Sequence, residues 1–216
     1  MTAIIRTGEL KMIDNSNYIV TGFKKTVLDK FPDKEKMLSD EFTLKLEKLL
    51  NENANSSKEK MRHLKAQILP GIAAYQVLQT VMSKEDALNT VHGYTEQHAL
   101  SARKKFKKLL RIPGLYRLVP AMFAKAVGKL FNESAGFSSK EYQTTGGVWR
   151  IDMIKCPYHD TCRMYGCPEL CTCFCDSDDV TYDNLHKNLL WHRTKTLGRG
   201  NDCCDFCLKT IRSRSK

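Results

Sequence analysis

The sequence predicts an α+β fold, in which a mostly helical N-terminal part packs on a small antiparallel sheet with a cysteine-rich C-terminal hairpin. Three observations support this class. Apolar residues recur at helical spacing through the first 135 residues, the pattern then changes to strand alternation, and all nine cysteines lie between Cys156 and Cys207. The chain has 216 residues, of which 42% are hydrophobic, so it is long enough to bury a core.

The first helices are predicted from apolar spacing and from breakers. Apolar positions between residues 18 and 31 fit a helix that stops before Pro32. Ser39 is expected to cap a second helix, because its hydroxyl can accept a hydrogen bond from the first turn. The polar segment 51–57 then predicts a linker.

Three further helical regions follow this linker. The first spans about residues 58–82 and should kink or restart at Pro70. The second covers about residues 84–110 and is expected to be capped by Ser83. The third is an amphipathic helix over residues 119–131.

The sheet is predicted from three segments. Residues 148–156 alternate between apolar and polar side chains, as a half-buried strand does. Residues 189–197 and 204–211 are predicted as two more strands, joined into a hairpin by the turn at 198–202. One or two short helices should occupy the interval 157–183.

The expected organisation is an N-terminal helical segment and polar linker over residues 1–57, followed by one α+β domain over residues 58–216. Within that domain the helices cover 58–135, and the sheet and cysteine-rich site cover 146–211. The N-terminus lacks the apolar region of a secretory signal, and the longest apolar stretch, residues 68–78, is too short to span a bilayer. A cytoplasmic protein without membrane insertion is therefore expected, with reduced thiols.

The net charge of +11 is unevenly distributed, because residues 97–132 carry nine cations and no acid. Such a run can contact phosphates or an anionic membrane surface. A solvated helix face is the commoner reason for it, especially over residues 103–117. No nucleic-acid-binding motif accompanies the run, so no nucleic-acid partner is predicted.

The cysteines first suggest a metal site. Cys204 and Cys207 have a common chelating spacing, and Cys171, Cys173 and Cys175 could converge on zinc or an iron–sulfur cluster. Strand alternation, however, puts Cys204 and Cys207 on opposite faces, which weakens chelation. The sequence therefore predicts no cofactor, with zinc or iron–sulfur binding as the alternative.

Acidic residues follow Cys175 in the sequence. They disfavour its thiolate unless a cation such as Arg193 offsets them. Asp178 and Asp179 could bind a cationic substrate or activate water. Alternatively, they could cap a helix that begins near Val180.

Cations in the predicted second strand and glycines in the turn that follows it form a third signal. Arg193 and Lys195 are natural carboxylate binders, although Asp202 and Asp205 could pair with them instead. The turn over residues 198–200 can expose backbone amides that would stabilise an oxyanion.

Several of these segments together resemble the L-2-amino-thiazoline-4-carboxylic acid hydrolase family. The matching features are the Pro-Glu-Leu of residues 168–170, the Cys-x-x-Asp of 175–178, the Arg-Thr-Lys-Thr-Leu-Gly-x-Gly of 193–200 and the Asp-x-Cys-Asp-Phe of 202–206. The resemblance implies hydrolysis of a C–N or C–S bond in a cyclic amidine, which opens the ring to a carbamoyl-cysteine.

This resemblance assigns expected roles to individual residues. The candidate catalytic residues are Cys175, Asp178, Cys204 and Asp205, and the candidate substrate-binding residues are Arg193, Lys195, Thr196 and Asp202. The preferred nucleophile is Cys175, because strand alternation places Cys204 in the core, and a carboxylate-activated water is the alternative. Arg193 with Lys195 would bind the substrate carboxylate, and Asp178 or Asp205 would hold the 2-amino group.

A non-catalytic function is the competing hypothesis. Small α+β domains with a cysteine-rich hairpin also resemble vinyl-reductase-type domains, which bind small molecules without transforming them. A small-molecule partner is thus expected under both hypotheses, and the sequence leaves the oligomeric state open.

Overall fold

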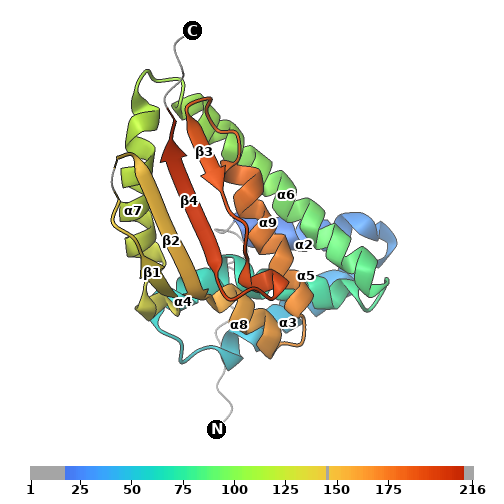
Figure 1. Cartoon of the computed structure of the whole chain (residues 1–216). Coiled ribbons are helices and arrows are strands. Elements are labelled where there is room, and N and C mark those ends of the chain that lie inside the picture. The colour runs from blue at the N-terminus through green and yellow to red at the C-terminus, as the bar shows by residue number, and fades with distance from the viewer. Residues whose placement is uncertain (1–17, 145, 212–216) are drawn as a thin grey trace. The chain divides into compact units, whose positions relative to one another are not determined.

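The computed structural model of the chain describes residues 18–144 and 146–211 (Figure 1). The N-terminal residues that were tested for a secretory signal lie outside this range. The chain divides into two compact units, residues 1–94 and 95–216, which are described separately below. The α+β class is confirmed, whereas the domain division at residue 57 stays a prediction.

The first unit is helical. Its elements are α2 (Tyr18–Lys30), the 3-10 turn η1 (Pro32–Lys34), α3 (Glu35–Glu52), α4 (Lys58–His63), the π-helical turn η2 (Leu64–Ile68), α5 (Leu69–Leu78) and the start of α6 (Lys84–Leu109). Nearly all of α5 is buried, and α2 and α3 pack against it. Phe23 and Phe42 are among the largest fully buried side chains of this core.

Helix boundaries in this unit confirm two predictions and correct one. The helical run that begins at Lys58 passes through the π-helical turn η2 and becomes α-helical again at Leu69, one residue before Pro70. The Ser83 hydroxyl accepts a hydrogen bond of 3.1 Å from the Asp86 amide at the start of α6. The prediction that Ser39 caps a helix is wrong. η1 leads directly into α3 at Glu35, so Ser39 lies inside the helix and its carbonyl accepts a hydrogen bond from Thr43.

The second unit combines the rest of α6 with a four-stranded antiparallel sheet. Its other elements are η3 (Leu115–Leu118), α7 (Val119–Leu130), η4 (Glu133–Ala135), β1 (Ser138–Glu141), β2 (Val148–Lys155), α8 (Pro157–Met164), η5 (Pro168–Leu170), α9 (Cys171–Tyr182), β3 (Leu189–His192), η6 (Leu197–Arg199) and β4 (Cys204–Thr210). The sheet order is β1-β2-β4-β3. The predicted strands therefore exist, and β1 is an additional edge strand that the polar sequence 138–141 did not indicate.

One face of this sheet is buried and the other is exposed. Trp149 on β2 and Trp191 on β3 both lie opposite Leu208 of β4, and these three side chains belong to the core of the unit. The α7 side chains Phe123 and Val127 pack against the same core. The prediction that Cys204 lies on the buried face of β4 is thus confirmed.

The second predicted strand, over residues 189–197, is shorter than expected, because β3 ends at His192. Beyond that point the carboxylate of Asp205 accepts hydrogen bonds from the backbone amides of Thr194 (2.8 Å) and Lys195 (2.6 Å). These bonds replace strand pairing, so the chain leaves the sheet and turns through η6. No helix in the described ranges is long and apolar enough to cross a membrane.

Candidate functional site

One face of α9 carries four reactive or ionisable side chains. Cys171, Cys175, Asp178 and Tyr182 follow one another at spacings of four, three and four residues, which places them on the same side of a helix. The thiols of Cys171 and Cys175 lie 3.9 Å apart. Asp178 and Tyr182 line a pocket further along the same face.

This pocket, about 80 Å³ in volume, is enclosed mostly by apolar and aromatic side chains. Its lining residues are Phe123, Val127, Phe131, Trp149, Met153, Asp178, Tyr182, Trp191 and Phe206. Asp178 is the one carboxylate among them. The pocket is roughly large enough for a few water molecules, and a planar ring, which needs about 150 Å³, would require it to widen.

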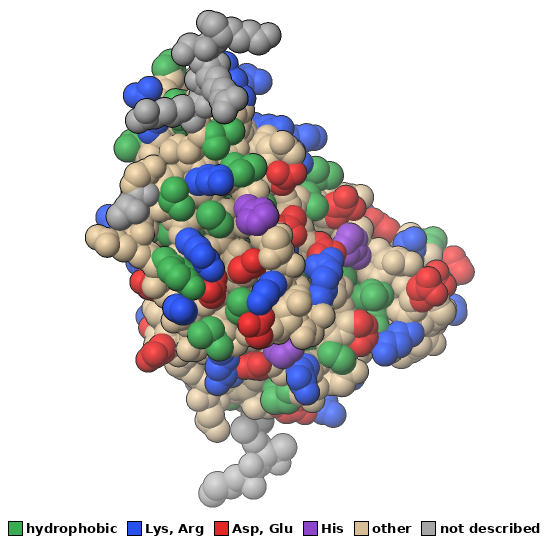
Figure 2. Space-filling view, viewed as in Figure 1, with side chains coloured by type: hydrophobic (Ala, Val, Ile, Leu, Met, Phe, Trp, Pro, Cys, Tyr) green, Lys and Arg blue, Asp and Glu red, His purple; other side chains and the backbone are tan. Residues whose placement is uncertain are grey.

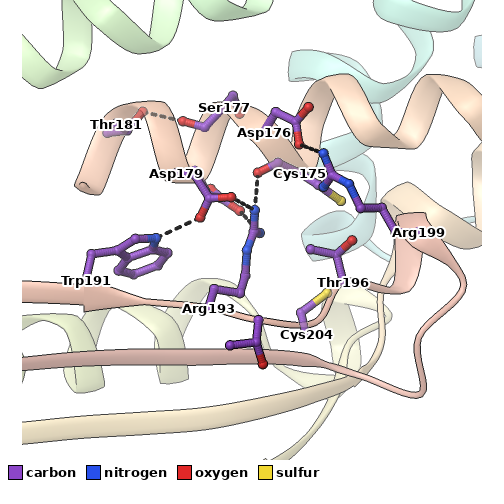
Figure 3. Close-up of polar contacts among 12 residues, drawn as sticks. Cys175, Asp176, Ser177, Asp179, Thr181, Trp191, Arg193, Thr196, Arg199 and Cys204 are labelled. Carbon is purple, nitrogen blue, oxygen red and sulfur yellow. Dashed lines mark hydrogen bonds and ion pairs between the residues drawn. The ribbon is translucent and has the colours of Figure 1, made fainter.

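The adjacent acid, Asp179, is occupied by structural contacts. Its carboxylate accepts a hydrogen bond of 2.8 Å from the Trp191 indole and a short one from Nη2 of Arg193 (Figure 3). The same Nη2 donates to the Cys175 carbonyl at 2.8 Å. The Arg193 side chain is only 1% exposed, so Asp179 balances a charge that is buried between α9 and the segment after β3.

Asp178 has a different environment. Its closest ionic partner is Nη1 of Arg193, at 3.5 Å. Although 41% of its side chain is accessible, that part faces a narrow pocket with apolar walls rather than open solvent, so the carboxyl group is poorly hydrated. Burial raises the pKa of Asp178 to about 7, and the negative charge of Asp179 adds to this effect, while Arg193 opposes it. A carboxyl group with this pKa can accept and return a proton at neutral pH.

Arg193 remains charged and keeps an unused donor. Burial alone would lower its pKa, but Asp179 and Asp178 outweigh burial and raise it. Within the described residues, Nη1 of Arg193 has no hydrogen-bond partner, although it is buried. Buried polar atoms are normally satisfied, so this atom indicates a position that a ligand or water completes.

The thiols nearby are neutral. The hydrogen bond with Cys171 raises the pKa of Cys175, and burial raises it further. Burial also raises the pKa of Cys204 to about 12, and its sulfur accepts a hydrogen bond of 3.2 Å from the Leu197 amide. A catalytic thiolate needs a lowered pKa, so neither cysteine is preactivated in this structure.

Thr196 is a second buried group with an unmet hydrogen bond. The residue is buried, and its hydroxyl has no hydrogen-bond partner within the described ranges. Figure 3 shows Thr196 together with Cys175 and Cys204, on the side of Arg193 away from Trp191. The candidate residues Cys175, Asp178, Arg193 and Thr196 therefore share one region.

Three other candidates lie on the opposite face. Asp205 follows Cys204 on β4 and so points to the exposed side, where it holds Thr194 and the Lys195 amide. Burial opposes ionisation of Asp205, but these hydrogen bonds outweigh it and lower its pKa. Lys195 and Asp202 form an exposed ion pair at 2.9 Å. The structure thus separates Lys195, Asp202 and Asp205 from Asp178.

The glycine turn packs tightly on α9. A Cβ atom at Gly198 would lie 3.0 Å from the Cys175 sulfur and 3.2 Å from the Cys171 sulfur. The amides of Leu197, Arg199 and Gly200 already donate within or near the turn. In this conformation these three amides are not available as an oxyanion hole, which corrects the expectation for residues 199 and 200, whereas for Gly198 it stays a prediction.

The metal alternative receives no geometric support in the part of the chain that the structure describes. No group of three or more His, Cys, Asp or Glu side chains is arranged there to hold a metal ion. On β4, Cys204 pairs with Met153 and is buried, whereas Cys207 pairs with Arg150 on the other face. The two sulfurs of this Cys-x-x-Cys therefore do not converge.

Two features of the site were not predicted. Asp178 and Asp179 do not cap a helix near Val180, because α9 begins at Cys171 and contains both. Tyr182 was also missed, although the spacing of residues 171, 175, 178 and 182 is visible in the sequence once a helix is assumed. The roles of Trp191 and Phe123 had no such local signal.

Comparison with known proteins gives one match. The sequence model of the family described as L-2-amino-thiazoline-4-carboxylic acid hydrolase matches residues 61–208. Neither a curated protein nor a solved structure matches the chain. The matched range covers more than half of the chain and includes all the residues that line the pocket.

Proposed function

Because the chain belongs to the L-2-amino-thiazoline-4-carboxylic acid hydrolase family, we propose that it opens the ring of a small cyclic amidine by adding water at the carbon between nitrogen and sulfur. L-2-amino-thiazoline-4-carboxylate is the model substrate. The observation that carries the proposal is Asp178, a carboxyl group with a pKa of about 7 in an aromatic pocket.

The pocket suits a flat, partly apolar ring. Phe123 and Tyr182 meet edge to face at 5.0 Å, and Trp191 lies 5.0 Å from Tyr182, so the walls are rigid aromatic surfaces. The amidine end of the substrate would lie at Asp178. Nη1 of Arg193 lies behind Asp178 and outside the pocket lining, so it would bind the substrate carboxylate, without help from Lys195, only after the Asp178 side chain moves aside.

The catalytic help that this hydrolysis needs from the protein is the transfer of protons. Ionised Asp178 takes a proton from water as the water oxygen bonds to the ring carbon. Asp178 passes this proton to the ring nitrogen, which gives a tetrahedral centre that carries a hydroxyl. The hydroxyl proton then moves through Asp178 to the leaving nitrogen or sulfur, as the C=O bond forms and the bond from the carbon to the leaving atom breaks. The product is a carbamoyl-cysteine, heavier than the substrate by one water.

Cys175 supplies a second candidate mechanism for the same reaction. Its thiol lies one helical turn before Asp178, which could act as its base. The raised pKa of Cys175 disfavours this route, so we assign the attack to water and give Cys175 a positioning role, because its carbonyl accepts a hydrogen bond from Arg193. Cys204 and Asp205 are assigned positioning roles, because they hold the segment that carries Arg193 and Thr196.

The test is turnover of L-2-amino-thiazoline-4-carboxylate, followed by mass spectrometry with and without a chelator. Asp178→Asn should lower kcat/KM by about 100-fold or more, because a general base is removed. The matched control is Asp176→Asn, because Asp176 lies on the same helix as Asp178. This substitution breaks an ion pair with Arg199, and the variant should remain active.

Other outcomes separate the competing hypotheses. A ligand-dependent rise in Tm without product would identify a binding module and contradict the hydrolase proposal. Loss of turnover on chelation would show that a metal ion takes part. Full activity of Asp178→Asn would exclude this residue as the base.

A further inference from the structure

The corner where α6 passes through η3 into α7, called here the α6–α7 corner, exposes large apolar side chains. Leu110 and Val119 are buried in the core of the second unit and anchor this corner. Their neighbours project outward with exposed fractions of 46%, 54%, 58% and 49% for Leu109, Ile112, Leu118 and Met122. Four exposed apolar side chains within residues 109–122, held in place by two buried anchors, make this corner a candidate interaction surface.

Cations surround these apolar side chains. Lys105 and Lys108 share a side of α6 with Leu109, and Lys125 and Lys129 follow Met122 at spacings of three and seven residues on α7. All four lysines are exposed, and no ion pair with a described residue holds them. Residues 97–132 contain no acid.

We propose that the α6–α7 corner docks on the surface of an anionic lipid bilayer. Apolar side chains that enter the headgroup boundary, together with lysines that remain among the anionic headgroups, are the combination that interfacial helices use. The exposed face of the sheet differs, because acidic and basic side chains are interspersed over it (Figure 2). The sheet face therefore lacks the excess of positive charge that an anionic bilayer attracts.

Charge argues against two other occupants. A second copy of the chain would bring the same cations against one another, and this like-charge contact opposes association. A nucleic acid would engage the cations but would leave Leu109, Ile112, Leu118 and Met122 without a partner. The bilayer is the occupant that uses both kinds of side chain.

Docking and the pocket use opposite sides of α7. Phe123 and Val127 line the pocket, whereas Met122, Lys125 and Lys129 lie on the outer side. Substitutions on the outer side should therefore leave hydrolysis unchanged. The docking proposal can fail or succeed independently of the proposed function.

The experiment is cosedimentation of the full chain with phosphatidylcholine vesicles, with or without phosphatidylserine. The chain should sediment with the anionic vesicles at low salt, much less at about 0.5 M salt, and not with neutral vesicles. Ile112→Ser/Leu118→Ser/Met122→Ser should weaken binding at least about tenfold. Ile154→Ser/Met164→Ser, which replaces exposed apolar residues elsewhere in the same unit, should bind normally.

Lysine variants test the electrostatic part. Lys105→Gln/Lys108→Gln should lose about fivefold in affinity per charge. The control Lys36→Gln/Lys58→Gln removes two exposed cations of the first unit and should bind normally. Failure to sediment with anionic vesicles, equal binding to neutral ones, or binding only to an RNA or DNA fragment would overturn the proposal. Self-association that depends on the three apolar residues, without vesicle binding, would do so as well.

Discussion

The carboxylate of Asp178 lies 3.5 Å from Nη1 of Arg193. Of the two acids that contact this guanidinium, Asp178 is the more distant. Asp179 binds the other amino group and the Trp191 indole. One acid is therefore committed to neutralising a buried cation, while the adjacent acid faces an apolar pocket. This difference makes Asp178 the candidate base, and it leads to the predictions below.

The pH dependence of turnover should follow Asp178. Its pKa is raised to about 7, and the ionised form is the base, so kcat/KM should rise with pH, reach half its maximum near pH 7 and level off above it. The same shift affects stability in the opposite sense. The folded chain holds this proton more tightly than the unfolded chain, whose Asp has a pKa of about 3.9, so this contribution to stability is lost as pH rises through 7.

Steady-state kinetics from pH 5 to about pH 9 measures the first effect. Thermal melts of the wild type and Asp178→Asn measure the second. The variant should gain stability relative to the wild type at high pH. An acidic limb centred near pH 4 would contradict the assignment of Asp178.

Replacement of Cys175 by alanine should leave turnover within about tenfold of normal, because water is the proposed nucleophile. The substitution keeps the backbone carbonyl that accepts from Arg193, so the guanidinium should stay in place. A loss above about 1000-fold with an unchanged Tm would instead favour covalent attack by this thiol.

Arg193 and Arg199 form a matched pair, since each joins α9 to the segment that follows β3. Arg193→Met should destabilise the chain by about 1–3 kcal/mol, because it removes the hydrogen bonds from a buried guanidinium to the Cys175 carbonyl and to Asp179, which is itself 45% exposed. Arg199→Met removes an arginine that is half exposed, and should cost within about 0.5 kcal/mol. Urea unfolding of both variants measures the difference, and equal losses would show that the Arg193 pair is not effectively buried.

Gly198→Ala should destabilise the chain by about 1–3 kcal/mol, because its Cβ would meet the Cys175 sulfur at 3.0 Å. In a Cys175→Ala background the cost should shrink, which a double-mutant cycle detects. Gly128→Ala on α7 is the control. No atom lies within 4 Å of its added Cβ, so the higher helix propensity of alanine should stabilise the chain slightly. An unchanged cost of Gly198→Ala without the sulfur would show that the clash lies elsewhere.

Local sequence signals predicted most of the elements. The periodicity of α2, α6 and α7 and the alternation of β2 and β4 were sufficient, because these elements bury one regular face. The errors occurred where local preference competed with other contacts. Ser39 has a side chain that can cap a helix, but α3 begins four residues before it. Residues 193–197 favour a strand, but the amides of Thr194 and Lys195 donate to the Asp205 carboxylate instead of to a neighbouring strand.

The sequence by itself determined the class of the fold, the family motifs and the spacing that aligns Cys171, Cys175, Asp178 and Tyr182 on one face of α9. Only the tertiary structure decided which acid is free to react. Trp191 and Arg193 reach Asp179 from another element, and aromatic residues of α7, β2 and β4 enclose Asp178. A carboxyl pKa depends on burial and on charges a few ångströms away, and both come from residues that are distant in the sequence.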